Sequence, residues 1–278
     1  MSESPHISAS TRLITLLGDP VAHSLSPQLH NAAFRALALD AVYVALRCSS
    51  SDCGALLRAI ARSGGAGNVT APHKEQAAAA VEVPSDAVRG TGACNTFWLE
   101  NDRVAGDNTD VEGFRRALHA FAGDVAAARV LLLGAGGAAS AVVAALAGER
   151  VTRVDIIARN QERLGQLSAR AAQWGIELKP TDRIKQPVDL IINATPLGFH
   201  EEDALPYPLE NLAPGTAIMD LVYRTDETAW VRRARENGMR AIDGKEMLLQ
   251  QAAASFERWW PLPAPRDAMR RALWSRPS

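Results

Sequence analysis

A glycine-rich turn near the middle of the chain constrains the fold more than any other feature. Four apolar residues, Val130 to Leu133, lead directly into Gly134-Ala135-Gly136-Gly137-Ala138, and an alanine-rich segment to Ala147 follows. The apolar run is typical of a strand buried on both faces. Glycines at these positions allow a tight turn and a close approach of the backbone to a pyrophosphate at a helix N-terminus. The strand–turn–helix order therefore predicts a Rossmann-type domain that binds a dinucleotide.

The end of the next predicted strand indicates which dinucleotide binds. Val154 to Ile157 is followed by Ala158, Arg159 and Asn160, with Arg163 one helical turn further on. An acidic residue at this place would bind the free ribose hydroxyls of NAD, whereas two arginines can pair with a phosphate on the ribose. The residues favour NADP over NAD. The alternative interpretation is a solvated basic start of a helix.

Two polar turns in the first half of the chain carry the candidate catalytic groups. The run Gly67 to Lys74 is typical of a short buried strand that ends in a turn, and Asn108-Thr109-Asp110 stands between a predicted strand and a predicted helix. A lysine after a strand is usually a solvated surface residue. If the two turns meet, however, Lys74 and Asp110 form an ammonium–carboxylate pair suited to proton transfer.

Two serines precede the first predicted helix. Ser26 stands before Pro27, which is the pattern of an N-cap residue and the first helical position, so we expect Ser26 to cap this helix. Ser24 is not needed for capping. Two hydroxyls beside the N–H groups of a helix start can hold a carboxylate, and a capped helix without a ligand is the alternative.

The order of the predicted elements indicates an α/β protein with two domains. Strands and helices alternate in the first half in the manner of a parallel sheet, and a hairpin turns at Asn101-Asp102. A helix from Lys245 to Trp260 is expected to pack back on the first domain. We therefore predict an N-terminal α/β substrate domain over 12–122 plus 245–278, and a doubly wound NADP-binding domain over 123–244.

Composition limits the classes of partner and the compartment. The 278 residues are 47% hydrophobic and carry a net charge of −1, which gives no reason to expect nucleic acid or a membrane surface. Cys48, Cys53 and Cys94 form no Cys-x-x-Cys pair and no even disulfide framework, and no metal-ligand cluster stands out. The run Leu13 to Leu17 is too short to span a membrane, and no signal-peptide pattern precedes it. We expect a cytoplasmic protein with a small-molecule substrate, and a homodimer is kept as a hypothesis.

A series of short motifs, taken together, resembles the shikimate/quinate dehydrogenase family over residues 18 to about 260. The motifs stand in family order: His23-Ser24-Leu25-Ser26-Pro27 with His30-Asn31, Asn68 to Lys74, Gly92 to Thr96, Asn108-Thr109-Asp110 with Gly113-Phe114, Gly134 to Ala138, Asn193-Ala194-Thr195, Asp220 to Tyr223, and Gly244 to Gln251. The resemblance implies an NADP-dependent oxidoreductase that interconverts 3-dehydroshikimate and shikimate, in the pathway to chorismate and the aromatic amino acids.

The resemblance also implies roles for individual residues. Lys74 and Asp110 would be the catalytic pair. The substrate would contact Ser24, Ser26, Asn68, Thr70, Asn95, Asp110, Tyr223 and Gln251. The cofactor would contact Gly134, Ala135, Gly136, Gly137, Ala138, Arg159, Asn160, Arg163, Thr195, Leu221 and Gly244.

The chain departs from the family pattern around the cofactor. Ala158 stands where the family usually has Asn, Pro196 where it has Ser, and Thr225 where it has Pro. Ala158 removes one polar contact to the cofactor. Two alternative functions remain: a quinate/shikimate enzyme that uses NAD as well as NADP, and an NADP-sensing module without catalysis. The intact Lys74 and Asp110 argue against the sensor.

Overall fold

The chain folds into two compact units, which the computed structural model describes over residues 7–275. The first unit contains the residues up to Thr109 and those from Leu249 onward, and the second unit runs from Asp110 to Leu248. Both division points fall inside helices, namely α5 (Thr109–Ala122) and α9 (Lys245–Trp259). The predicted boundaries lie at the C-terminal end of α5 and directly before the first residue of α9, so the assignment of α5 and of the first turn of α9 to one domain stays a prediction.

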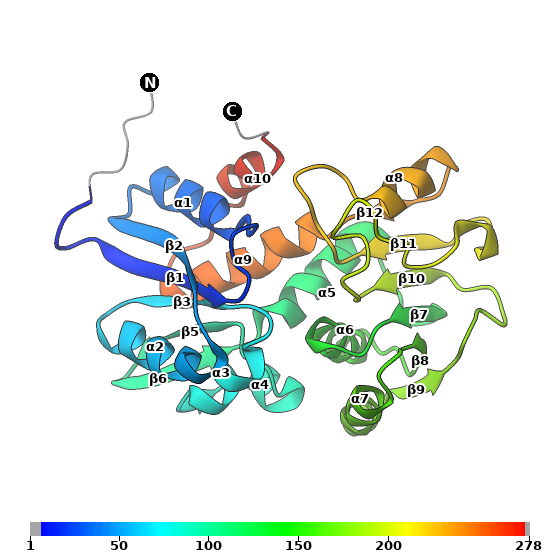
Figure 1. Ribbon diagram of the computed structural model, residues 1–278, viewed down its shortest axis with the longest axis horizontal. Coiled ribbons are helices and arrows are strands. Elements are labelled where there is room, and N and C mark those ends of the chain that lie inside the picture. Colours follow the sequence, from blue (N-terminus) through cyan, green and yellow to red (C-terminus); the bar gives the residue numbers. More distant parts are fainter. Residues whose placement is uncertain (1–6, 276–278) are drawn as a thin grey trace. The chain divides into compact units, whose positions relative to one another are not determined.

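The first unit is built on a mixed sheet with the strand order β2-β1-β3-β5-β6-β4, of which Figure 1 labels all strands but β4. The first three strands of the chain are parallel, and β5 and β6 form an antiparallel hairpin that continues the sheet beside β3. The predicted hairpin turn is present, since Asn101 and Asp102 both have positive φ angles, of 48° and 59°. The strands are β1 (Arg12–Gly18), β2 (Ala41–Arg47), β3 (Ala66–Val69), β4 (Val83–Pro84), β5 (Thr96–Glu100) and β6 (Arg103–Asp107).

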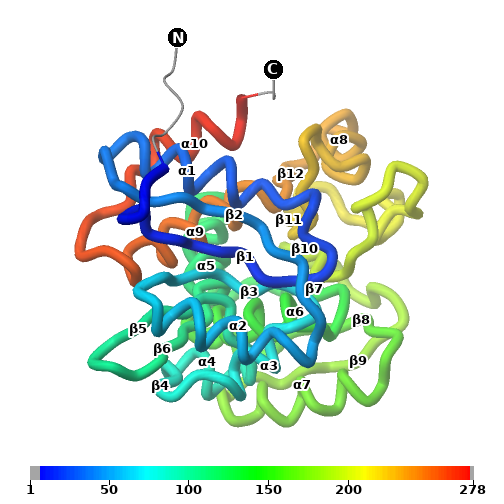
Figure 2. The backbone as a smooth tube through the Cα atoms, turned by 60° about the vertical axis from the view of Figure 1, so that its left-hand side comes forward, coloured from blue at the N-terminus to red at the C-terminus, as the bar shows by residue number. Residues whose placement is uncertain are grey.

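Helices cover this sheet because packing their apolar faces against its apolar residues removes both from water. The helix α2 buries Cys53 and Leu57 against Phe97 and Val104 in one core cluster. The C-terminal half of α9 packs on the sheet as predicted, and Trp259 donates to Thr96 Oγ1 at 3.0 Å. The helices of this unit are α1 (Ser26–Ala36), α2 (Ser50–Arg62), α3 (Lys74–Ala80), α4 (Asp86–Thr91), α10 (Arg266–Trp274) and this part of α9 (Figure 2).

The start of α1 corrects one prediction. Ser26 is the first residue of the helix and not its cap, because Leu25 before it already has helical dihedral angles (φ −85°, ψ −3°) and no side chain caps the helix from that position. The hydroxyl of Ser24 accepts a hydrogen bond from the Ser26 N–H at 3.2 Å. Ser24 therefore satisfies an N–H group at the helix start, which was the role expected of Ser26.

The second unit is a doubly wound parallel sheet with the strand order β12-β11-β10-β7-β8-β9. Counted from β7, this is the order 3-2-1-4-5-6 of a Rossmann fold, and the strand order reverses between β7 and β10. Ligands bind at the carboxyl ends of the strands beside such a reversal. The strands are β7 (Val130–Leu133), β8 (Arg153–Ile157), β9 (Glu177–Pro180), β10 (Leu190–Asn193), β11 (Ala217–Asp220) and β12 (Ala241–Ile242).

Alternate residues of the central strand fill two separate cores. Val130 and Leu132 pack with α6 (Gly137–Gly148), α7 (Gln161–Gln173) and α5 on one face of the sheet. Leu131 and Leu133 pack on the other face with α8 (Ala229–Glu236) and the segment that holds the short helix η1 (Leu209–Asn211). Burial on both faces explains why β7 is a continuous apolar run. Among the described residues, no helix combines the length and apolar character needed to cross a membrane.

Candidate functional site

The glycine-rich turn after β7 has one glycine that the protein itself requires. Gly134 has a φ of +101°, and a Cβ atom there would lie 3.0 Å from both the Ala194 carbonyl oxygen and Thr195 Cγ2. Its N–H donates to the Ile157 carbonyl at 2.8 Å. These contacts bring the glycine turn, the end of β8 and the predicted cofactor residue Thr195 together at the carboxyl edge of the sheet.

The next two glycines have no such requirement. A Cβ atom on Gly136 or Gly137 would meet no atom of the protein within 4 Å, and Gly136 has an ordinary φ of −88°. Both glycines lie at the start of α6, Gly136 at the N-cap and Gly137 as the first helical residue, with open space around them. That space suits a phosphate, because a helix N-terminus attracts anions. The turn from Gly134 to Ala138 therefore fits the pyrophosphate of a dinucleotide.

The end of β8 presents two arginines to solvent. Asn160 caps α7, and its Oδ1 accepts from the Arg163 N–H at 2.9 Å. Arg159 and Arg163 are exposed, and neither guanidinium forms a hydrogen bond or ion pair within the part of the chain that the structure describes. Asp155 lies in the middle of β8, where Arg153 is 3.8 Å away. Both guanidinium groups are thus available to a phosphate on the ribose.

A buried polar pair supports the turn after β10. Asn193 accepts from Thr195 N at 3.0 Å and from Thr195 Oγ1 at 2.6 Å, and its amide donates to Asp220 Oδ1 at 2.8 Å. Burial raises the pKa of Asp220 to about 6, and Thr228 donates to its second oxygen at 2.8 Å. Sequence reasoning used these residues only as parts of motifs and missed that they orient Thr195.

The turns after β11 and β12 lie against each other. A Cβ atom on Gly244 would be 2.2 Å from the Leu221 carbonyl oxygen, so only glycine fits there. The Gly244 N–H donates to the Val222 carbonyl at 2.9 Å, and the half-buried Tyr223 follows. Leu221 also donates through its N–H to the Asn193 carbonyl at 2.9 Å. The predicted cofactor residues Thr195, Leu221 and Gly244 are therefore neighbours.

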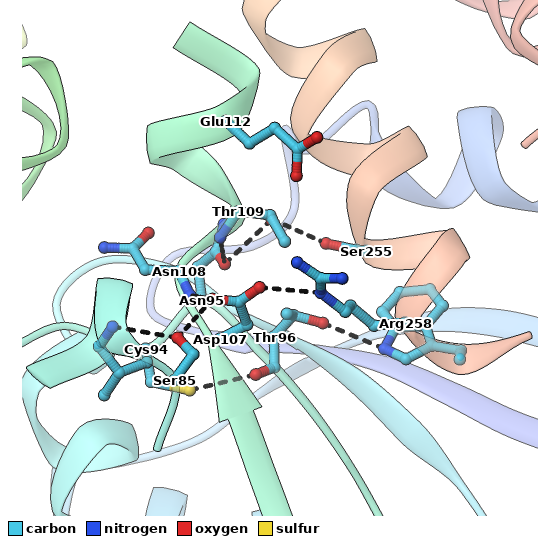
Figure 3. Close-up of polar contacts among 12 residues, drawn as sticks. Ser85, Cys94, Asn95, Thr96, Asp107, Asn108, Thr109, Glu112, Ser255 and Arg258 are labelled. Atoms are coloured by element: carbon cyan, nitrogen blue, oxygen red, sulfur yellow. Dashed lines mark hydrogen bonds and ion pairs between the residues drawn. The ribbon is translucent and has the colours of Figure 1, made fainter. Parts of the chain in front are cut away.

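In the first unit, two buried asparagines predicted to bind substrate are joined to each other (Figure 3 labels Asn95). Asn68 Nδ2 donates to the Asn95 carbonyl at 3.0 Å and to Ser255 Oγ at 2.9 Å. Asn95 Oδ1 accepts from Thr109 N at 2.8 Å, and Asn95 Nδ2 lies 3.4 Å from Gln251 Oε1. The structure thus brings Asn68, Asn95 and Gln251 together.

The candidate acid–base lysine stands beside this amide group. Lys74 is the first residue of α3, and its carbonyl accepts from the Cys94 N–H at 2.9 Å, which places it next to Asn95. The preceding turn is tied at Thr70, whose N–H donates to Leu17 O at 2.8 Å and whose carbonyl accepts from His73. The main chain that carries Lys74 is therefore fixed on both sides.

The other candidate catalytic residue, Asp110, is the second residue of α5 and is buried. The start of this helix is held by Asp107, which accepts from Asn108 N at 2.8 Å and from Arg258 Nε at 2.9 Å (Figure 3). Sequence reasoning did not identify Asp107 or Arg258. Asp110 and Tyr223 belong to the second unit, so the pairing of Lys74 with Asp110 and a contact of Tyr223 with substrate stay predictions.

The two serines at the start of α1 lie close together, as the bond from Ser26 N to Ser24 Oγ shows. Ser26 is buried and Ser24 is partly exposed. A hydroxyl on each side of a helix start remains a suitable arrangement for a carboxylate.

Three protein-family models match the chain. A shikimate dehydrogenase substrate binding domain matches residues 16–97, a shikimate / quinate 5-dehydrogenase model matches 116–197, and a shikimate 5'-dehydrogenase C-terminal domain matches 244–273. These ranges include the glycine turn, the end of β8, Thr195, Gly244 and the buried amides, whereas Asp110, Asp220, Leu221 and Tyr223 lie between the ranges.

Relatives similar over the whole length are known. The shikimate dehydrogenase (NADP(+)) of Rubrobacter xylanophilus is 40% identical, over 97% of this chain and 98% of the relative. A structure of the Thermus thermophilus shikimate 5-dehydrogenase with NADP(H) and shikimate has a TM-score of 0.84 at 32% identity, and covers 94% of this chain and 98% of that one. The Listeria monocytogenes shikimate 5-dehydrogenase, in complex with shikimate and NAD, has a TM-score of 0.87 at 27% identity, over 97% and 99% of the two chains.

Proposed function

Because the chain belongs to the shikimate dehydrogenase family, we propose that it catalyses the reversible NADPH-dependent reduction of 3-dehydroshikimate to shikimate. The observation that carries this proposal is the buried amide pair of Asn68 and Asn95 directly beside the main chain of Lys74. Amide groups suit the ring hydroxyls of such a substrate, and an ammonium group suits the oxygen that is reduced. A protein that only senses NADP would have no use for this arrangement.

NADPH, when bound, would supply the hydride that the carbonyl carbon of the substrate accepts. The carbonyl oxygen then gains negative charge and needs a proton. We assign this proton to the Nζ of Lys74, which leaves the amine neutral, and the carboxylate of Asp110 would hold the ammonium form before transfer. In the oxidation of shikimate the same amine accepts the hydroxyl proton.

The residues of the second unit fit NADP. The open space at Gly136 and Gly137 suits the pyrophosphate, and the exposed guanidinium groups of Arg159 and Arg163 suit the ribose phosphate. Thr195, Leu221 and Gly244 would contact the nicotinamide end, since they lie at the carboxyl ends of β10 and β11 and just after β12.

A cytoplasmic location fits the thiols. Cys48, Cys53 and Cys94 are all buried and free, as expected in a reducing compartment. The net charge of −1 gives no support to a nucleic-acid partner. A homodimer stays a prediction, and sedimentation of the purified chain would decide it.

The activity is tested by incubating the purified chain with NADP and shikimate and following the formation of NADPH. Quinate and NAD are used in the three other combinations under the same conditions. We expect shikimate with NADP to give the highest catalytic efficiency. Equal efficiency with quinate or NAD would identify the broader quinate/shikimate enzyme, and no NADPH formation with either substrate would contradict the proposal.

The carboxylate cradle gives a separate prediction. Replacing Ser24 or Ser26 by alanine is expected to raise the KM for shikimate. The rise should correspond to a loss of binding free energy of about 0.5–2 kcal/mol for each lost hydrogen bond. Steady-state kinetics with Ser63→Ala as the control checks this, because the Ser63 hydroxyl donates to the Ile60 carbonyl near the end of α2 and forms no other hydrogen bond within residues 7–275. Ser24→Ala is also expected to lower the Tm, since it removes the acceptor of the Ser26 N–H. An unchanged KM in both variants would place the carboxylate elsewhere.

A further inference from the structure

We propose that Ser255 on α9 is a positioning residue that fixes the orientation of both substrate-binding amides, Asn68 and Asn95. The inference rests on the proposed function, since it concerns the same substrate site. It assigns a role to a residue that is four positions after Gln251 and therefore on the same face of the helix.

Ser255 is fully buried, and Figure 3 shows it joined to Thr109, which lies next to Asn95. Its Oγ is 2.9 Å from Asn68 Nδ2 and 2.9 Å from Thr109 Oγ1. Thr109 Oγ1 in turn lies 3.1 Å from Asn95 Oδ1. The residues Asn68, Ser255, Thr109 and Asn95 thus form a continuous chain of side-chain hydrogen bonds, which we name the amide chain.

The direction of every bond in the amide chain follows from the groups present. Asn68 Nδ2 can only donate, so Ser255 Oγ accepts from it. Asn95 Oδ1 can only accept, so the Thr109 hydroxyl donates to it. The single hydroxyl proton of Thr109 is then in use, and the proton between the two hydroxyls must come from Ser255. All bonds therefore run from Asn68 toward Asn95.

Tyr43 fixes the amide oxygen of Asn68. Its hydroxyl lies 2.9 Å from Asn68 Oδ1, and an amide oxygen requires that this hydroxyl donates. The Tyr43 ring is stacked on His30 with centroids 4.5 Å apart, which limits the movement of the hydroxyl. The amide of Asn68 is thus held in one orientation from both sides, by a donor at its oxygen and by acceptors at its nitrogen.

This orientation decides what each amide can offer a substrate. Both N–H groups of Asn68 are used, by the Asn95 carbonyl and by Ser255, so only Oδ1 can serve a ligand and it must accept. Asn95 Oδ1 already accepts from Thr109 N and Thr109 Oγ1, so Asn95 can serve a ligand only through Nδ2, which also faces Gln251 Oε1 at 3.4 Å, and it must donate. The amide chain therefore selects a substrate with one hydroxyl that donates to Asn68 and one oxygen that accepts from Asn95.

Ser255 is the link that couples the two orientations. Without its hydroxyl, Asn68 Nδ2 loses one of two acceptors and Thr109 Oγ1 loses its donor. The terminal torsion of an asparagine has a broad, roughly two-fold profile, so an amide with fewer partners samples other orientations. Substrate binding then has to select the productive one, which weakens the apparent affinity.

Ser255→Ala is expected to raise the KM for shikimate about 3- to 15-fold, the effect of about one net hydrogen bond. The KM for NADP and the Tm should change little by comparison. Thr96→Val is the matched control, because it also removes one buried hydroxyl from this unit, but one that bonds Trp259 Nε1 and the Gly67 carbonyl instead of a substrate amide. Thr96→Val should lower the Tm without the rise in KM.

The decisive readout is a double-mutant cycle. If Ser255 acts through Asn68 and Asn95, Ser255→Ala should have a much smaller effect on KM in an Asn68→Ala background than in the parent. An unchanged KM in Ser255→Ala, or equal effects in both backgrounds, would overturn the proposal. If Ser255→Ala does not fold, Ser255→Cys takes its place, because it keeps the shape but bonds weakly, and the same outcomes apply. A parent enzyme without activity on shikimate would instead contradict the proposed function.

Discussion

Replacing Lys74 by alanine is expected to lower kcat for shikimate oxidation by about two to four orders of magnitude, the usual contribution of a positioned acid–base group. The side chain stands at the start of α3, beside the buried amides, and its main chain is fixed through Cys94. Because the residue is partly exposed at a helix start, the fold should be retained. Steady-state and single-turnover kinetics of the purified variant measure the effect.

Two further variants make this result specific. Lys179→Ala removes an exposed lysine from the edge strand β9 and should leave kcat unchanged. Lys74→Arg keeps the positive charge but does not release a proton at working pH, so it separates proton donation from electrostatic stabilisation. Strong activity in Lys74→Arg would show that charge alone suffices. A Lys74→Ala variant within about threefold of the parent would remove Lys74 from the chemistry, since such groups contribute far more.

The sequence predicted those parts of the fold whose conformation depends on residues close together in the chain. The order of an apolar strand, a glycine turn and a helix at Val130 to Ala147 could be predicted because apolar residues favour the buried strand, glycines the tight turn and alanines the helix. The hairpin at Asn101-Asp102 was predicted for the same reason, since both residues tolerate positive φ.

The elements that the sequence analysis missed have weaker local patterns. The strand β9 (Glu177–Pro180) is a short edge strand with three exposed residues, so no apolar period marks it. The helix α10 (Arg266–Trp274) buries only Met269 and Leu273, and it is defined by its packing against α1. The cap at α1 was assigned to the wrong serine because Leu25 adopts helical angles that its residue type does not dictate.

The residues that the sequence analysis assigned to ligand contacts belong to short motifs, whereas the residues that hold them in place through other side chains carry no such local signal. Asn68 and Asn95 belong to recognisable motifs, but Ser255 is 187 positions from Asn68 and its partner could not be deduced from spacing. The only signal was the position of Ser255 one helical turn after Gln251. Asp220 behind Thr195 is a similar case, since only the sheet brings β11 beside β10.

The preference for NADP over NAD should be large and should depend on two side chains. We expect the catalytic efficiency with NADP to exceed that with NAD by about ten- to a thousandfold, since charge-assisted hydrogen bonds contribute about 1.5–3 kcal/mol each and solvent exposure reduces this. Arg159 and Arg163 are both exposed, and Ala158 offers no polar side chain beside them, so we expect the lower part of this range.

Replacing both Arg159 and Arg163 by alanine should abolish most of this preference and leave the kinetics with NAD nearly unchanged. The reason is that the phosphate on the ribose is the only part of NADP that NAD lacks, and no carboxylate directly follows β8 to bind a free ribose hydroxyl. Replacing both Arg232 and Arg233, two exposed arginines of α8, by alanine removes the same two charges and serves as the control. The measurement is the ratio of kcat/KM for the two cofactors in the parent and in both variants. A ratio at or below one in the parent would show that these arginines face solvent and that the cofactor is chosen elsewhere.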